Sequence, residues 1–213
     1  MKIFFDVDGV LVDGWHVNPE LRKPRNASIE ADLGVNLSEF EHKFFIEKSN
    51  PLGSAMDACV AGQRDLKDAL AEVLPQVGYQ GHVEDFVHYW FEKDSNVSIE
   101  VLELVKTLSL TTDIELFIAT GQEHFRAAYI WNKLRFSELF KQMFFSADIG
   151  YLKSDIRFFT TINSRLGVSE TERPIFFDYR EDVVMLAHQA GWDAVVFHTI
   201  EDIRSHPRLN ELF

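Results

Sequence analysis

The chain begins with a short apolar run that ends in two acids. The run Lys2–Phe5 leads directly into Asp6, and Asp8 and Gly9 follow. A buried strand rarely ends in two carboxylates unless a cation or a reaction uses them, because burying an unpaired charge is costly. A turn at Gly9 lets both side chains point into one crevice. One acid can then act as a nucleophile, while the other gives and takes a proton.

Polar groups also follow the later strands that the sequence predicts. They are Thr120 and Gly121, then Lys153, then Asp178 with Asp182 four residues on. Ligands bind at the carboxyl ends of the strands in a doubly wound parallel sheet, so we expect these groups at one rim. Acids with a hydroxyl and a lysine suit phosphoryl transfer, because a hard cation, a lysine and a hydroxyl neutralise and orient phosphate oxygens.

Short apolar runs alternate with helical patterns along most of the chain, which predicts an α/β fold with a Rossmann-like doubly wound parallel sheet. The strands are predicted at Lys2–Phe5, Ile114–Ala119, Met143–Phe145, Pro174–Phe177 and Ala194–Phe197. The helices between them are predicted at Ile99–Leu108, Phe125–Phe136, Asp155–Leu166 and Glu181–Ala190.

One region, from about Trp15 to Lys93, lacks any convincing strand pattern. Helical patterns occur there at Ser38–Lys48, Arg64–Leu74 and Val83–Glu92. The sequence therefore predicts a core domain of residues 1–14 and 95–213 and an inserted all-helical domain of residues 15–94. The borders are expected near Gly14 and near Asp94–Val97, where short polar stretches suit a hinge.

Composition limits the classes of function. The 213 residues carry a net charge of −13, which argues against nucleic-acid and anionic-membrane partners, because both need a basic surface. The single cysteine, Cys59, excludes an internal disulfide framework and predicts a cytoplasmic protein. A transmembrane helix is not expected, since no apolar run is long enough. Asp6 and Asp8 interrupt any secretory signal at the start of the chain.

The order and spacing of these motifs resemble the haloacid dehalogenase-like (HAD) hydrolase superfamily. The first family motif, an apolar strand followed by D-x-D-G, matches the segment that ends at Asp6-Val7-Asp8-Gly9. The second, a strand ending in Thr or Ser, matches Thr120. The third, often G-x-x-K-P-D, matches Gly150-x-x-Lys153-Ser154-Asp155, in which Ser154 replaces the proline and is a good helix N-cap.

The resemblance implies a role for each matching residue. Asp6 would be the nucleophile and Asp8 the general acid and base, with the Asp6 side chain and the Asp8 backbone carbonyl binding Mg²⁺. Thr120, Gly121 and Lys153 would hold the phosphate. The helical insertion would be a C1-type cap that closes over the site and selects the substrate. The acid at Asp8 favours a phosphatase, since family dehalogenases lack an acid there.

The fourth family motif is imperfect, and two alignments compete. The family uses two acids here, as DD-x-x-x-N/D or GD-x-x-x-D. If Asp178 is the first acid of the DD pair, Tyr179 replaces the second and Val183 the N/D position. If Asp178 pairs with Asp182, both acids are present and the set Asp6, Asp8, Asp178 and Asp182 would complete the metal site, although one residue is then extra before Ala190.

The first hypothesis is a Mg²⁺-dependent phosphomonoester hydrolase that acts on a small phosphorylated metabolite through an aspartyl-phosphate intermediate. The second is a phosphotransferase or mutase of the same superfamily, with the same intermediate and a different acceptor. The third is a catalytically weak binding protein on a HAD scaffold, because Tyr179 alters the fourth motif. The sequence identifies neither the substrate nor the oligomeric state.

Overall fold

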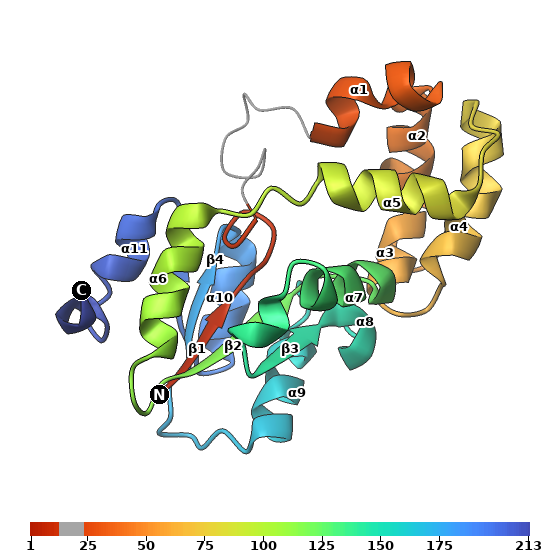
Figure 1. The fold of residues 1–213 in the computed structure, drawn as a ribbon. Helices are drawn as coiled ribbons and strands as arrows, with labels where there is room; N and C mark the ends of the chain where they lie inside the picture. The colour runs from red at the N-terminus through yellow and green to blue at the C-terminus, as the bar shows by residue number, and fades with distance from the viewer. Residues whose placement is uncertain (13–23) are drawn as a thin grey trace.

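A five-stranded parallel sheet forms the centre of the fold. The computed structural model describes residues 1–12 and 24–213. The strands stand in the order β3-β2-β1-β4-β5 (Figure 1). They are β1 (Lys2–Phe5), β2 (Glu115–Thr120), β3 (Gln142–Phe145), β4 (Ile175–Asp178) and β5 (Asp193–Val196). All five strands predicted from the sequence are confirmed to within one residue at each end.

Helices cover both faces of the sheet, because successive strand residues point to opposite sides. Ile3 and Phe5 of β1 lie in one apolar cluster, and Phe4 between them lies in another. The first cluster is covered by α6 (Ile99–Ser109), α7 (His124–Asn132) and α11 (Ile200–Arg204). The second is covered by α8 (Ser146–Ile149), α9 (Ile156–Leu166) and α10 (Glu181–Gln189).

Residues 24–93 form a separate helical group beyond the carboxyl end of the sheet (Figure 1). Its helices are α1 (Pro24–Leu33), α2 (Leu37–Glu41), the π-helix η1 (His42–Ile46), α3 (Ala55–Val60), α4 (Leu66–Val73), the 3₁₀ turn η2 (Leu74–Val77) and α5 (Val83–Lys93). A cluster of buried aromatic rings, including Phe40, Phe44, Phe86 and Trp90, holds them together. We call this group the cap.

The cap joins the sheet domain through two segments. The first segment, with the border predicted near Gly14, lies outside the described residues. The second follows α5, which ends at Lys93, and reaches α6 at Ile99. We call residues 94–98 the linker. Val97 of the linker forms an isolated bridge with Val12, so the linker lies beside the loop that follows β1.

Several local predictions differ from the structure. The pattern at Ser38–Lys48 divides into α2 and a π-helix, and the pattern at Phe125–Phe136 breaks at Asn132. Arg135 has a positive φ of 61°, which ends any helical continuation there. Asp155, not Ser154, is the N-cap of α9 and accepts the Arg157 N–H. Helices α1, α3 and α8 were not predicted, because α3 and α8 are short and α1 carries few apolar positions.

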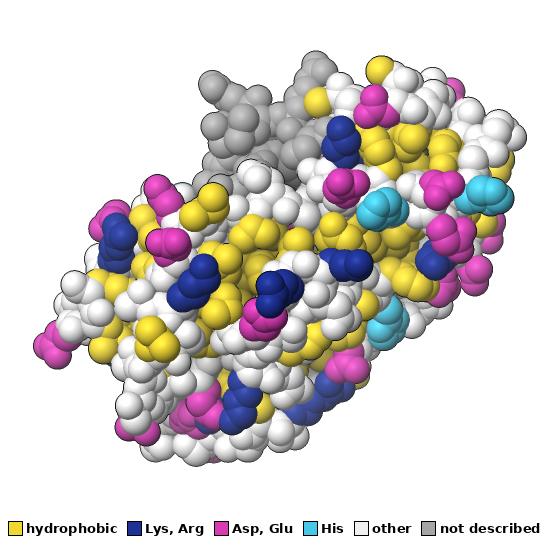
Figure 2. Space-filling model, viewed as in Figure 1, with side chains coloured by type: hydrophobic (Ala, Val, Ile, Leu, Met, Phe, Trp, Pro, Cys, Tyr) yellow, Lys and Arg dark blue, Asp and Glu magenta, His cyan; other side chains and the backbone are white. Residues whose placement is uncertain are grey.

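The surface carries both signs of charge. On the face drawn in Figure 2, lysine and arginine side chains are interspersed with acidic ones, and hydrophobic patches lie between them. In the part of the chain that the structure describes, no helix is long and apolar enough to cross a membrane.

Candidate active site

Strand β1 delivers Asp6 to the carboxyl edge of the sheet. The strand pairs with β4 so that Phe5 lies opposite Phe177, and the Asp6 N–H donates to the Phe177 carbonyl at 3.0 Å. The Asp6 carboxylate is buried, and its Oδ1 accepts the Val7 N–H at 2.8 Å. The backbone thus fixes one oxygen of this carboxylate and directs the other toward the centre of the rim.

Lys153 lies between two buried carboxylates. Helix α8 ends at Gly150, whose φ of 84° lets the chain turn back to the rim. The Lys153 Nζ lies 2.6 Å from Asp6 Oδ2 and 2.7 Å from Asp178 Oδ2. All three side chains are buried, so little solvent screens these ion pairs. The structure therefore brings together groups that lie at or after the ends of three different strands.

The charges of this group are unbalanced, because one lysine faces two carboxylates. Burial raises the pKa of Asp6 to about 7, and the negative charges of Asp178 and Asp8 act in the same direction against Lys153. Burial alone would lower the pKa of Lys153, but the carboxylates of Asp178 and Asp6 raise it above its ordinary value. Lys153 therefore stays charged, and an excess of negative charge remains at the strand ends.

Asp8 lies in a more open environment than Asp6. Its side chain is 31% exposed, whereas that of Asp6 is 3% exposed. Asp8 Oδ2 accepts a hydrogen bond from Gln122 Nε2 at 2.5 Å, and its Oδ1 lies 3.7 Å from Arg126 Nη2. The two acids of the first motif thus have different partners, which suits two different chemical roles.

Thr120 is the last residue of β2, and Gly121 follows it. Thr120 is buried, and its hydroxyl oxygen has no hydrogen-bond partner among the described residues. A buried hydroxyl without a partner is costly unless a ligand or water satisfies it. A Cβ added to Gly121 would lie 3.9 Å from Lys153 Cβ, so this turn lies against the lysine.

The segment after β4 separates the candidates of the fourth motif. Asp178 reaches Lys153, whereas Asp182, in the first turn of α10, is 57% exposed and forms an ion pair with Arg180 at 2.5 Å. Burial, with the charge of Asp6, raises the pKa of Tyr179 to about 12. The structure does not bring Asp182 to the other predicted metal ligands, because the first turn of α10 directs it to solvent.

Three residues of the site region were not identified from the sequence. Gln122 and Arg126 contact Asp8, and Glu123 is buried at the N-terminus of α7. Glu123 accepts the N–H groups of Phe125 and Arg126, and burial raises its pKa to about 7. The sequence did contain one usable signal for Arg126. This charged residue lies four positions before the buried Ile130, so both side chains occur on the same face of α7.

Similarity to known proteins is found among solved structures. No protein-family model and no curated protein matches the chain. The structure of HAD family enzyme bt-2542 from Bacteroides thetaiotaomicron, in complex with magnesium and inorganic phosphate, is similar with a TM-score of 0.69 at 14% identity, covering 91% of this chain and 92% of that chain. A predicted HAD-like family hydrolase from Porphyromonas gingivalis is similar with a TM-score of 0.68 at 17% identity, covering 91% and 89%.

An L-2-haloacid dehalogenase from Xanthobacter autotrophicus is also similar, with a TM-score of 0.59 at 14% identity over 91% of this chain and 75% of that chain. These likenesses span the sheet and the helical insertion together, because each covers nine-tenths of the chain. At such low identity they bear on the fold alone. The chain therefore has the fold of the haloacid dehalogenase-like hydrolases.

Proposed function

We propose that the protein is a Mg²⁺-dependent phosphomonoester hydrolase that acts on a small phosphorylated metabolite. The observation that carries the proposal is the buried Asp6 carboxylate, held by Lys153 at 2.6 Å, with the more exposed Asp8 two residues on. One acid is fixed by the backbone and a lysine, and the other can exchange protons with a bound substrate. This division of roles suits attack on phosphorus followed by hydrolysis.

Each residue has a role in that reaction. Asp6 attacks phosphorus and forms an acyl phosphate, while Asp8 protonates the leaving alcohol and then takes a proton from the attacking water. Lys153 and the Thr120 hydroxyl bind phosphate oxygens, with Gly121 bringing its backbone close. The buried and otherwise unpaired Thr120 hydroxyl supports this assignment. The cap covers the carboxyl edge of the sheet and selects the substrate.

The donor set fits a magnesium ion. Mg²⁺ commonly takes one or two carboxylates and fills its remaining positions with water and phosphate oxygens. Asp6 and Asp178 supply two buried carboxylates that share one lysine, and the unbalanced negative charge favours a cation. We propose that Asp6, Asp178 and the Asp8 carbonyl hold it, with Asp182 outside the set. When bound, Mg²⁺ offsets the charge of the phosphate and orients it toward Asp6.

Asp8 also separates this proposal from dehalogenation, the activity named for one of the similar structures. A halide leaves without needing a proton, whereas an alcohol leaving from a phosphate ester needs one. An acid that is partly exposed and hydrogen-bonded by Gln122 is therefore useful to a phosphatase. Chloride release from a 2-haloacid at a rate above ester hydrolysis would overturn the assignment.

The test is hydrolysis of an aryl phosphate by the purified protein with Mg²⁺ and with a chelator. We expect Mg²⁺-dependent release of inorganic phosphate and a loss of roughly 10³-fold or more in Asp6→Asn, because the nucleophile is removed. Asp148→Asn is the matched control, since Asp148 is an exposed acid paired with Arg165 on α9. Equal turnover by Asp6→Asn and wild-type protein would refute the mechanism.

A further inference from the structure

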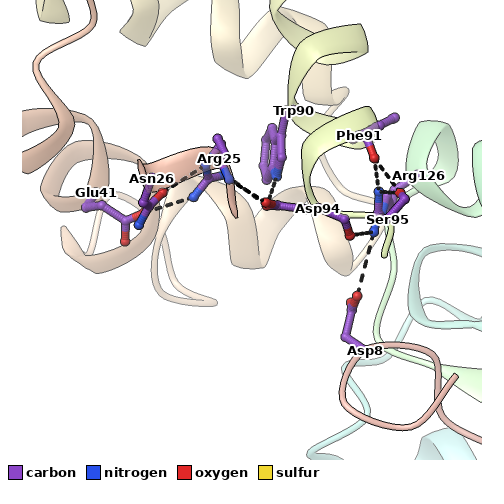
Figure 3. Close-up of polar contacts among 9 residues, drawn as sticks. All are labelled: Asp8, Arg25, Asn26, Glu41, Trp90, Phe91, Asp94, Ser95 and Arg126. Atoms are coloured by element: carbon purple, nitrogen blue, oxygen red, sulfur yellow. Dashed lines mark hydrogen bonds and ion pairs between the residues drawn. The ribbon is translucent and has the colours of Figure 1, made fainter. Parts of the chain in front are cut away.

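Arg126 of α7 connects the catalytic edge to the cap. Its side chain is buried, although it carries a charge. The Nη2 atom lies 3.7 Å from Asp8 Oδ1 and donates to the Asp94 carbonyl at 2.6 Å. The Nη1 atom donates to the Phe91 carbonyl at 3.0 Å and to Ser95 Oγ at 2.6 Å. One guanidinium therefore contacts Asp8 and the end of α5 together with the linker (Figure 3).

The linker is in turn fixed to the interior of the cap. Asp94 Oδ1 accepts the Arg25 N–H at 3.0 Å, and Asp94 Oδ2 accepts Trp90 Nε1–H at 2.9 Å. Arg25 also donates to Glu41 Oε1 at 2.9 Å. Figure 3 shows these contacts as a continuous series from Glu41 through Arg25 and Asp94 to Arg126 and Asp8. The position of the linker is therefore set by the packing of the cap.

The geometry of Arg126 suits a positioning role better than a phosphate-binding one. The guanidinium donors with described partners point to Phe91, Asp94 and Ser95, and the fork reaches Asp8 only at ion-pair distance. The three hydrogen bonds fix the plane of the guanidinium, and its positive charge then attracts Asp8 Oδ1 from a fixed position at 3.7 Å. Gln122 holds the other oxygen of Asp8, so the two side chains from the segment after β2 together orient this carboxyl.

We propose that Arg126 is a positioning residue for Asp8, and that it makes the orientation of Asp8 depend on the linker and therefore on the seating of the cap. This inference rests on the proposed function only for the chemistry of Asp8. The contacts that carry it are independent of any substrate. Asp8 is held for proton transfer when the linker bonds of Arg126 are made, and a displaced linker removes the support.

The test compares two phosphate esters with different leaving groups. The value of kcat/KM is measured for a 4-nitrophenyl ester, whose leaving group needs little protonation, and for a simple alkyl ester, whose leaving group needs a general acid. In Arg126→Met we expect kcat/KM for the alkyl ester to fall roughly tenfold or more beyond its fall for the aryl ester, since general acids contribute about 10²–10⁴-fold. Arg126→Lys should recover part of this difference, because it keeps the charge but not the fork.

Ser95→Ala tests the linker half of the proposal, because it removes one bond to Arg126 and leaves Asp8 untouched. It should lower kcat/KM for the alkyl ester more than for the aryl ester, as Arg126→Met does, but to a smaller extent. Arg204→Met on α11, an exposed arginine paired with Glu201, is the matched control. An equal fall in kcat/KM for both esters in Arg126→Met would mean that Arg126 has a purely structural role. An unchanged ratio of the two kcat/KM values in Ser95→Ala would show that the orientation of Asp8 does not depend on the linker.

Amide hydrogen exchange gives a readout that does not need activity. Arg126→Met should speed exchange both in the linker and in residues 7–12, which contain Asp8 and the bridge partner of Val97. Faster exchange confined to the linker would overturn the inference even if the protein hydrolyses no ester. Conversely, a wild-type protein inactive on both esters would refute the proposed phosphatase and leave the coupling to be decided by exchange.

Discussion

Lys153 of the sheet domain and Arg25 of the cap are each a buried cation between two acids, but the two sites differ in how far the acids are buried. In the sheet domain the acids beside Lys153 are as inaccessible as the lysine, with Asp6 3% and Asp178 0% exposed. In the cap Arg25 is 1% exposed, but its partners Glu41 and Asp94 are 25% and 16% exposed.

The electrostatic consequence differs in the same way. Burial raises the pKa of Asp6 in the sheet domain, whereas in the cap burial lowers the pKa of Arg25. The rings of Trp90 and Phe45 cover the Arg25 guanidinium at 4.6 and 5.2 Å. A cation under aromatic rings with partly solvated acids is a stable packing unit. Two desolvated carboxylates that share one lysine keep an unbalanced negative charge, which is the feature on which the proposed catalytic use of this group rests.

Removing the lysine should have the largest effect. Lys153→Met leaves Asp6 and Asp178 buried without their cation, and we expect the free energy of unfolding to fall by about 3–5 kcal/mol at neutral pH. Urea denaturation measures the loss. The double variant Lys153→Met with Asp6→Asn should recover part of it, because one of the unpaired charges is gone. A double variant no more stable than Lys153→Met would contradict this account.

Glu123 tests buried charge at the junction of the two regions, where Asp65 of the cap and Arg126 of α7 act on it. The folded state raises its pKa from 4.5 to about 7, so the folded state binds more protons than the unfolded chain in that interval. Its contribution to stability is therefore greatest below about pH 4.5 and is lost as the pH rises to about 7, by about 2–3 kcal/mol.

The measurement is the free energy of unfolding of wild-type protein and Glu123→Gln between pH 5 and pH 8, approximate limits that bracket most of the transition. The wild-type protein should lose stability with rising pH relative to Glu123→Gln, because glutamine does not titrate. Parallel pH profiles for the two proteins would show that Glu123 ionises normally in the fold.

Arg25→Met should cost less than Lys153→Met, although Arg25 is equally buried. The variant loses a charged hydrogen bond to Glu41 and its contacts with aromatic rings, which together correspond to about 1–3 kcal/mol. The acids left behind can still reach water, so no desolvated charge remains. Urea denaturation under the same conditions gives the comparison, and a loss equal to that of Lys153→Met would remove the distinction between the two sites.

Asp182→Asn should have the smallest effect. Its exposed ion pair with Arg180 is of the kind that contributes little, and we expect less than about 0.5 kcal/mol in stability and less than about a twofold change in kcat/KM. The dependence of the rate on Mg²⁺ concentration should also stay unchanged. A rise in the Mg²⁺ concentration needed for half-maximal rate would restore the alignment in which Asp182 completes the metal site.

The sequence alone predicted the strands and the polar residues that follow them, for a local reason. Short continuous apolar runs mark the buried strands, so residues directly after Lys2–Phe5 or Ile114–Ala119 must lie at the strand ends. Lys153 was found in the same way, from its distance after β3. The cap helices α1 and α3 were missed because α1 carries few apolar positions and α3 is too short to show a helical period.

The tertiary structure alone decided which acids share the lysine and what holds Asp8. Both alignments of the fourth motif used Asp178 and left Asp182 open, and in the structure the end of β4 reaches Lys153, whereas Asp182 in the first turn of α10 faces solvent. The contacts of Arg126 join segments more than thirty residues apart in the chain. The local sequence pattern determines on which face of its helix or strand a side chain lies. The partners of that side chain depend on how the elements pack against one another, and the local pattern does not encode this packing.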